Sequence, residues 1–383
     1  MNLENINIYS MIPVSFITSM VMGWFIIPYV LFISLKKRLF DRVDDRKLHK
    51  RAVPRLGGIV FFPVITFATS LTISLILGTC NDYELGIFSG VLLKEWLLLC
   101  CGLILIYLVG IADDLDGVRY RNKFIVQIVS ALFIPFGNIY INNLYGICGI
   151  YEIPAYIGIP FTALLIVFVT NALNLIDGVD GLASGLASIA FIAFAILFLQ
   201  IHMFIHVIIA LAGLGVLIPF MYYNITGKED RYSKIFMGDT GSLSLGFLLV
   251  FLGVRLAMSS PNIPVLNHAI IYPFCILFVP IFDAVRVMVS RSIRGRNMFK
   301  PDRAHIHHKI LDLGFTHIQT TLIICVYAGC MILFNLALKE SININILIVI
   351  DLLIGAIVNQ ILNALNRRKQ KMAALAERKT EEK

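Results

Sequence analysis

The sequence predicts an all-α, polytopic integral membrane protein. Of its 383 residues, 58% are hydrophobic, and the mean hydropathy is +0.84, which is far from the composition of soluble domains. Apolar windows of about 20 residues, the length that crosses a bilayer, can be placed eleven times. We expect spans at 12–35, 57–78, 95–112, 124–142, 156–173, 182–201, 203–223, 241–258, 268–290, 318–338 and 344–365.

The first span predicts the orientation of the chain. No basic leader precedes it, so we expect it to be a retained span and not a signal peptide. The basic run Lys36-Lys37-Arg38 follows it, which by the positive-inside rule places the N-terminus outside and, with eleven spans, the C-terminus in the cytoplasm. In that topology 29 of the 32 Lys and Arg residues lie in inner segments. We expect one transmembrane domain over 1–365 and a basic cytoplasmic tail over 366–383 without chemistry.

Charge and cysteine usage narrow the class of protein further. The net charge of +8 belongs to the cytoplasmic face, where it meets anionic lipid and any anionic substrate, and it does not indicate a nucleic-acid partner. The seven cysteines lie mostly in apolar windows without Cys-x-x-Cys spacing. We interpret them as small apolar side chains.

The stretch from Asn171 to Leu182 is the most informative segment. It places Asn171, Asn174, Asp177 and Asp180 between two apolar runs. A carboxylate at the bilayer centre costs at least about 2.5 kcal/mol, so these side chains should lie at a membrane edge or in a wet cavity. A binding or catalytic role is the leading hypothesis. The alternative is a polar turn between helices, because Asp-Gly pairs are common turn formers.

Two further acidic sites interrupt apolar sequence. Asp113-Asp114 ends the third span and is followed by a basic segment that includes Lys123. Adjacent carboxylates repel unless a cation lies between them, and Mg²⁺ binds carboxylate and phosphate oxygens; solvated loop charge is the alternative. Asp239, between glycines before the eighth span, is the strongest candidate for a metal ligand, with a helix N-cap as the alternative.

Two basic loops lie on the same predicted side. The loop 36–58 carries basic residues including Lys47 and ends in Gly57-Gly58, which would let backbone approach a ligand closely; the alternative is topology-determining charge. The loop 291–317 carries Arg303 and a histidine cluster at 305, 307 and 308. Zinc is disfavoured because no Cys or further His lies at a supporting spacing. A loop that folds over a diphosphate fits better.

One acidic and one basic residue precede the second of these loops. Asp283 and Arg286 lie three residues apart at the end of the ninth span, a spacing that lets them pair on one helix face.

Taken together, the motifs resemble a known family. The series Asp113-Asp114-x-x-Gly117, Asn171-x-x-Asn174-x-x-Asp177-Gly178-x-Asp180-Gly181-Leu182, Gly238-Asp239-x-Gly241-Ser242 and Asp302-Arg303-x-His305-x-His307-His308 is similar to that of the polyprenyl-phosphate N-acetylhexosaminyl-1-phosphate transferases, glycosyltransferase family 4. The resemblance covers about 12–338. The histidine loop resembles the branch that uses UDP-N-acetylglucosamine and departs from the muramoyl-pentapeptide branch, whose loop carries three consecutive histidines.

The resemblance implies a reaction and a location. GlcNAc-1-phosphate would be transferred from UDP-GlcNAc to undecaprenyl phosphate, releasing UMP and starting a surface glycan such as O-antigen, teichoic acid or enterobacterial common antigen. The enzyme would lie in the bacterial inner membrane with its site on the cytoplasmic face, and a homodimer is one expected assembly. UDP-GalNAc or UDP-MurNAc-pentapeptide are alternative donors. A transporter is disfavoured because nearly all charge lies on one side, and the Asp-Gly-x-x-Ala-Arg signature of CDP-alcohol phosphotransferases is absent.

The resemblance also assigns roles to residues. Mg²⁺, with Mn²⁺ as the alternative metal, would bind Asp239 and Asn174. Asp113, Asp114 and Asp177 would be catalytic, with Asp113 or Asp114 orienting or deprotonating the acceptor phosphate. Direct displacement is favoured over an aspartyl-phosphate intermediate because phosphate is already a competent nucleophile. Asp180 and Phe236 would face the uracil, Arg303 and His305 the diphosphate, and Lys47 the acceptor phosphate. The expected substrate-binding residues are Lys47, Asn171, Asp180, Phe236, Arg303, His305, His307 and His308.

Overall fold

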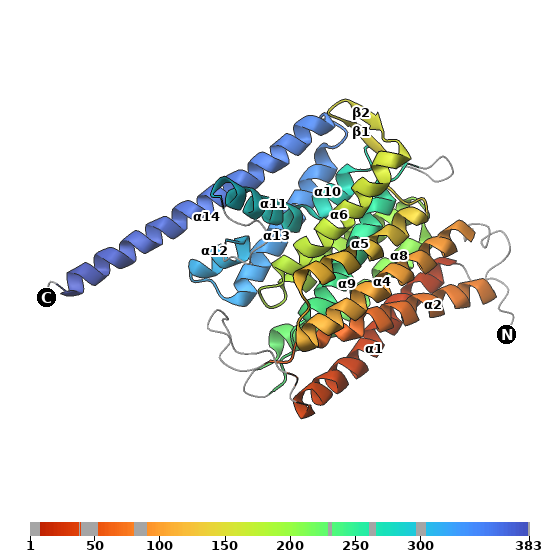
Figure 1. Cartoon of the computed structure of the whole chain (residues 1–383), viewed down its shortest axis with the longest axis horizontal. Helices are drawn as coiled ribbons and strands as arrows, with labels where there is room; N and C mark the ends of the chain where they lie inside the picture. Colours follow the sequence, from red (N-terminus) through yellow and green to blue (C-terminus); the bar gives the residue numbers. More distant parts are fainter. Residues whose placement is uncertain are drawn as a thin grey trace.

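The structure is a computed structural model that describes residues 8–37, 39, 53–79, 90–228, 232–259, 266–295 and 304–381. Helices run side by side in an elongated bundle, and α14 projects beyond it toward the C-terminus (Figure 1). The helices are α1 (Ile8–Lys36), η1 (Gly57–Val60), α2 (Phe61–Thr79), α4 (Gly90–Asp116), α5 (Tyr120–Phe136), α6 (Ala155–Ile176), α7 (Leu182–Gln200), α8 (Phe204–Met221), η2 (Tyr222–Thr226), α9 (Gly238–Ala257), α10 (Ile271–Ile276), α11 (Phe278–Ile293), α12 (Ile306–Asp312), α13 (His317–Leu338) and α14 (Ile344–Glu381).

The helices confirm a polytopic, mainly α-helical membrane protein. Within the described ranges, nine helical segments are long and apolar enough to cross a bilayer, and each coincides with a predicted span. The remaining two predicted spans also contain helix but do not form a single long one. The count of eleven crossings therefore stays a prediction.

The two exceptions have local causes. The predicted span 124–142 overlaps α5, which is only 17 residues long and ends at Phe136, with Gly137 as its C-cap. The predicted span 268–290 is divided into α10 and α11 at Leu277. Pro280 lies in the first turn of α11, where proline is tolerated because the missing N–H has no intrahelical partner there.

A small β-hairpin is the one departure from all-α structure among the described residues. Strands β1 (Asn143–Ile147) and β2 (Ile150–Glu152) pair antiparallel between the predicted spans 124–142 and 156–173. Asn345, at the start of α14, fastens the hairpin: its Oδ1 accepts from the Cys148 N–H at 2.8 Å, and its Nδ2 donates to the Gly146 carbonyl at 3.0 Å. The hairpin thus joins the middle of the chain to its last helix.

Helix α9 is the centre of the bundle. Every residue from Thr240 to Ala257 is buried, between helices that include α4, α6 and α7. Two glycines allow the closest contacts: a Cβ on Gly110 of α4 would lie 2.5 Å from the Thr240 Cα, and one on Gly246 would lie 2.9 Å from the Thr170 Cα of α6. These approaches bring together the ends of the three helices that carry the predicted acidic motifs.

The opposite ends of α4 and α9 are joined by a buried ion pair. Arg255 of α9 donates from Nε to Glu95 Oε2 at 2.8 Å, and His206 Nε2 of α8 lies 3.2 Å from the same oxygen. Glu95 and Arg255 are only 4% and 3% exposed. The pair explains how an arginine is tolerated inside the bundle.

We expect Glu95→Ala to destabilise the protein strongly, because removing one partner leaves Arg255 buried without its counter-charge, a loss of about 3–5 kcal/mol. The double variant Glu95→Leu/Arg255→Met should recover much of this loss. Thermal unfolding in detergent measures both, with Glu152→Ala on the exposed hairpin as the control. A wild-type midpoint for Glu95→Ala would contradict the prediction.

Candidate active site

Two carboxylates from distant helices meet around one lysine. Asp113 lies in the last turn of α4 and Asp239 in the first turn of α9. Lys123 Nζ, from the start of α5, lies 2.9 Å from Asp113 Oδ2 and also pairs with Asp239 Oδ2. Since the aspartates are 126 residues apart in the chain, only the packing of α4, α5 and α9 brings them together. Asp113 also accepts from the Val118 N–H at 2.6 Å, which fixes its orientation.

An amide from α6 completes this cluster. Asn174 Nδ2 donates to Asp239 Oδ1 at 3.1 Å and to Ser242 Oγ at 2.8 Å. One turn earlier, Asn171 exchanges hydrogen bonds with Gln127 of α5, at 2.7 and 3.3 Å. The two asparagines therefore differ: Asn174 contacts the acidic cluster, whereas Asn171 joins α6 to α5.

Asp114 has different hydrogen-bond partners from Asp113. Its carboxylate accepts from the Asp239 N–H at 2.7 Å, the Thr240 N–H at 2.9 Å and the Thr240 hydroxyl at 2.6 Å. These are the donors left unpaired at the start of a helix, so Asp114 caps α9 from another helix. The turn also needs Gly238, whose φ is +71° and whose added Cβ would lie 2.1 Å from the Arg55 carbonyl oxygen.

The segment with Gly57-Gly58 packs against the chain itself. The N–H groups of Gly57 and Gly58 donate to the carbonyls of Phe236 and Met237, both at 2.9 Å, and the Phe236 N–H donates to the Pro54 carbonyl at 2.8 Å. A Cβ on Gly58 would lie 2.2 Å from the Gly241 backbone. The close approach predicted for a ligand is thus made by the backbone that leads into α9.

Asp180 is held in an ion-pair cluster at the start of α7. Lys234 Nζ lies 2.7 Å and His317 Nδ1 2.9 Å from its Oδ2. These partners hold the pKa of Asp180 below its ordinary value, outweighing the effect of its burial. Lys234 Nζ also lies 5.8 Å from the centre of the Phe236 ring. The two residues predicted at the uracil are therefore linked through Lys234.

Asp177 has the opposite electrostatic environment. It follows α6 directly, and no described residue donates a hydrogen bond to its carboxylate. Burial raises its pKa to about 7, aided by the negative charges of Asp239, Asp180 and Asp114 and opposed by Arg55. A carboxylate in this position favours a cation or a proton beside it.

The histidine loop is anchored by Asp283 of α11. Its Oδ2 lies 2.7 Å from His305 Nδ1, and its Oδ1 accepts from the Ile306 N–H at 3.0 Å. Arg286 donates to Asp283 at 2.6 Å and to the Ala304 carbonyl at 2.7 Å. The predicted pairing of Asp283 with Arg286 is confirmed, and the same aspartate orients His305.

The other histidines stack beside it. The rings of His305 and His307 are nearly parallel with centroids 5.8 Å apart, and the His308 ring centroid lies 4.3 Å from that of His307. His307 is buried against Gly178, where an added Cβ would lie 2.5 Å from its Nε2. Burial, together with His308, lowers the pKa of His307 to about 3, so this ring is neutral at physiological pH.

The structure brings most of the predicted motifs to one end of the bundle. Lys47 and Arg303 lie outside the described residues, so their predicted roles stay predictions. The sequence assigned no site role to Lys123, Gln127, Lys234, Asp283 or His317. Lys123 had a signal, because it is one of three cations, with Arg119 and Arg121, in the ten residues after Asp113. The others are recognisable only from contacts between distant helices.

Comparison with known proteins finds a match over the same motifs. Residues 96–257 match the family model described as glycosyl transferase family 4, a range that contains all three acidic motifs. Over this range the chain is similar to glycosyl transferase family 4. It is 29% identical over 332 residues to a Bacillus subtilis protein named probable undecaprenyl-phosphate N-acetylglucosaminyl 1-phosphate transferase, covering 86% of each chain. Proteins from Yersinia pestis and Escherichia coli O157:H7, named undecaprenyl-phosphate alpha-N-acetylglucosaminyl 1-phosphate transferase, are 29% identical over 78% of this chain and 76% of theirs.

These similarities confirm the resemblance predicted from the motifs and support a hexosamine-1-phosphate transferase. The family range ends at the end of α9, whereas the relatives extend the likeness over most of the chain.

We expect Asp177→Asn to stabilise the metal-free protein at high pH. The pKa of Asp177 is about 7 in the folded chain against an ordinary value of 3.8, so the folded state keeps a proton that the unfolded state has lost. Its contribution to stability therefore falls as pH rises from about 4 to about 7. Thermal midpoints in chelator should coincide for both proteins near pH 4 and favour the variant above pH 7. A difference independent of pH would contradict the assignment.

Proposed function

We propose that the protein transfers GlcNAc-1-phosphate from UDP-GlcNAc to undecaprenyl phosphate, releasing UMP and a lipid-linked sugar diphosphate that starts a cell-envelope glycan. The observation that carries the proposal is the convergence of Asp113 and Asp239 on the Lys123 ammonium, with Asn174 bonded to Asp239. The names of the relatives support the substrates.

The donor set fits a divalent cation that prefers oxygen. Asp239 and Asn174 present carboxylate and amide oxygens, the ligands that Mg²⁺ and Mn²⁺ bind, and Lys123 demonstrates that positive charge is stabilised beside Asp239. We propose these two residues as ligands of Mg²⁺, with Mn²⁺ as the alternative. When bound, the metal would neutralise part of the charge on the sugar-nucleotide diphosphate.

The chemical step is an in-line displacement. An oxygen of the lipid phosphate attacks the β-phosphorus of UDP-GlcNAc, a new P–O–P bond forms, and the bond to the UMP phosphate breaks. Two anions must approach, so the residues here have to position them and compensate their charge. Lys123 can turn from Asp239 toward a phosphate oxygen while Asp113 stays oriented by the Val118 N–H.

The structure favours Asp113 over Asp114 for contact with the acceptor phosphate. All three hydrogen bonds of Asp114 fix the start of α9, and therefore Asp239. We propose that Asp114 positions the metal ligand and that Asp113, together with Asp177, orients or deprotonates the lipid phosphate. A phosphate monoester is a sufficient nucleophile, so no covalent enzyme intermediate is required.

The nucleotide would lie toward the Asp180 cluster and the histidine loop. Phe236 offers a ring for stacking on uracil, and Lys234 is positioned between it and Asp180. His305, oriented by Asp283, can donate a hydrogen bond to the diphosphate. We propose that Asn171, His307 and His308 also belong to the substrate-binding site. The proposed roles of Arg303 and Lys47 rest on the resemblance alone.

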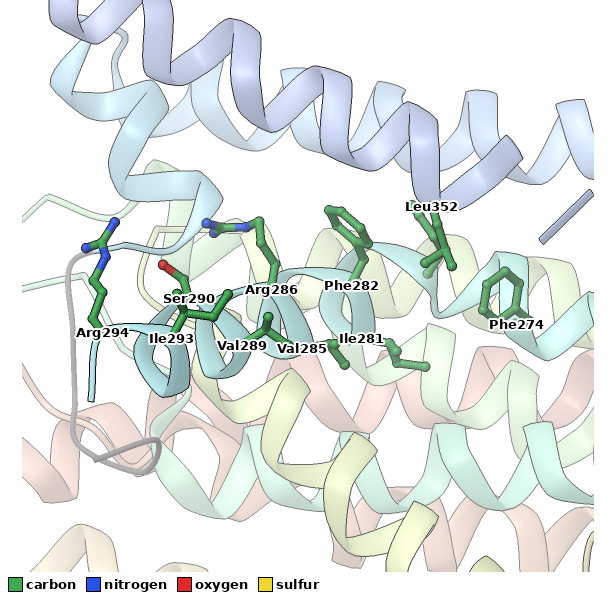
Figure 2. Close-up of a pocket in the computed structure, with 11 residues that line it drawn as sticks. Phe274, Ile281, Phe282, Val285, Arg286, Val289, Ser290, Ile293, Arg294 and Leu352 are labelled. Carbon is green, nitrogen blue, oxygen red and sulfur yellow. The ribbon is translucent and has the colours of Figure 1, made fainter. Parts of the chain in front are cut away.

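An apolar groove on α11 suits the acceptor chain. The cavity has a volume of about 640 Å³ and is lined mostly by Phe, Ile, Val and Leu side chains of α10, α11 and α14. Figure 2 shows Arg286 and Arg294 toward one end of the groove and Phe274 toward the other. A polyprenyl chain could lie along the apolar part with its phosphate near Arg286, which also contacts the histidine loop.

We base the proposed membrane side on the basic loops next to the acidic motifs. The acidic motifs lie where α4, α6 and α9 meet, at the ends that join the basic loops. We propose that these ends face the cytoplasm of a bacterial inner membrane, with the N-terminus outside and eleven crossings in which α5 and the pair α10 and α11 complete the count. UDP-sugars are available on that side.

Exchange of labelled UMP into UDP-GlcNAc tests the proposed reaction. Membranes that contain the protein should catalyse this exchange only when undecaprenyl phosphate and Mg²⁺ are present. UDP-GalNAc and UDP-MurNAc-pentapeptide in parallel identify the donor. Uptake of a nucleotide sugar into sealed vesicles without release of UMP would instead support a transporter.

Asp239→Asn should abolish this metal-dependent transfer while leaving the protein folded, because the amide keeps the shape but loses the charge that binds the metal. The expected loss is at least about a hundredfold. Asp116→Asn, an exposed aspartate at the end of α4, is the matched control and should retain wild-type rates. Wild-type-like transfer by Asp239→Asn would remove this residue from the metal site.

A further inference from the structure

The short helix of the histidine loop is held at its C-terminal end by the last helix of the chain. Asn366 Nδ2 of α14 donates to the Lys309 carbonyl at 2.9 Å, and Lys369 Nζ donates to the Asp312 carbonyl at 2.7 Å. In return, Lys309 Nζ donates to Asn359 Oδ1. These three bonds join α12 to α14 across at least 50 residues of sequence.

The bonds satisfy a physical need of α12. A helix of seven residues is too short to be stable alone, and its last carbonyls have no partners within the helix. Asn366 and Lys369 provide donors for two of them, and the lysine also places positive charge at the negative end of the helix dipole. Asp283 holds the other end through Ile306, so α12 is fixed at both ends.

The three residues of α14 that make these bonds share one face of the helix. Positions 359, 366 and 369 are separated by seven and three residues, which places them on the same side of an α-helix. Helix α14 continues unbroken from its apolar part to Glu381, and the contacts with α12 fall where the apolar part ends. The tail that the sequence predicted to be without chemistry therefore begins with a structural contact to the histidine loop.

We propose that the cytoplasmic part of α14, through Asn366 and Lys369, is a positioning element for the histidine loop and thereby for the diphosphate of the nucleotide sugar. The assignment to the nucleotide sugar rests on the proposed function. Helix α12 lies close to the site. It begins directly after His305, and it carries His307, which packs on Gly178 next to Asp177 in the sequence. A shift of α12 would move both histidines relative to the acidic cluster.

Two double variants of the full-length protein test the proposal. Asn366→Ala/Lys369→Ala removes both donors to α12. Gln370→Ala/Lys371→Ala is the matched control, since it removes one amide and one lysine that are exposed on the next turn. Lys369→Arg retains a cationic donor and should behave as wild type.

Hydrogen–deuterium exchange reports the contact itself. We expect amides of 306–314 to exchange faster in Asn366→Ala/Lys369→Ala and at wild-type rates in the control, with the rest of the bundle unchanged in both. In the UMP-exchange assay the KM for UDP-GlcNAc should rise about threefold to tenfold, the scale of one or two lost hydrogen bonds. The kcat and the KM for undecaprenyl phosphate should change by less than about twofold.

The outcomes test separately the contact between α14 and α12, its effect on binding of the nucleotide sugar, and the proposed function. Unchanged exchange over 306–314 in Asn366→Ala/Lys369→Ala would overturn the contact and the inference with it. Faster exchange with an unchanged KM would overturn the positioning role. If wild-type protein did not turn over any UDP-sugar, the proposed function would fail, while the exchange measurement would still decide whether α14 holds α12.

Discussion

The pairing of Lys123 with Asp113 and Asp239 is the interaction on which the site depends. Two carboxylates brought together at the edge of an apolar bundle repel each other, and the repulsion is large where water is partly excluded. A single ammonium between them removes most of that cost. The ligand-free protein is thus already organised around a positive charge, and α4, α5 and α9 can pack closely because their polar ends are compensated.

The paired aspartates illustrate how one motif supplies two functions. Asp114 is used entirely to cap α9, and because that helix carries Asp239 in its first turn, the cap sets where the second carboxylate lies. Asp113 accepts only from Val118 and Lys123 among the described residues. Adjacent residues on a helix point in different directions, so a pair can address a structural partner and a substrate at the same time.

The sequence predicted the helices and the convergence of the motifs for a sound physical reason. Apolar length defines spans, and the alternation of spans puts every second loop on the same side of the membrane. It could not predict pairings that depend on rotation and depth of neighbouring helices. Gly57-Gly58 was interpreted as a ligand contact but packs on the backbone before α9, and Asp283, known only as a partner of Arg286, also orients His305. Nothing local in the sequence distinguishes these outcomes.

Charged side chains are compensated to different degrees at the two ends of the bundle, and this difference bears on function. At the end away from the motifs, Glu95 is buried and pairs with the Arg255 guanidinium, and the His206 ring lies beside it, so the charges of Glu95 and Arg255 compensate each other. At the other end Asp177 has a raised pKa and lacks a donor among the described residues, so that end has charge left to compensate. A transport pathway needs ligand-accepting groups that continue from one face to the other. Among the described residues, charges are paired at one end of the bundle and incompletely compensated at the other, an arrangement better suited to chemistry at a single membrane surface.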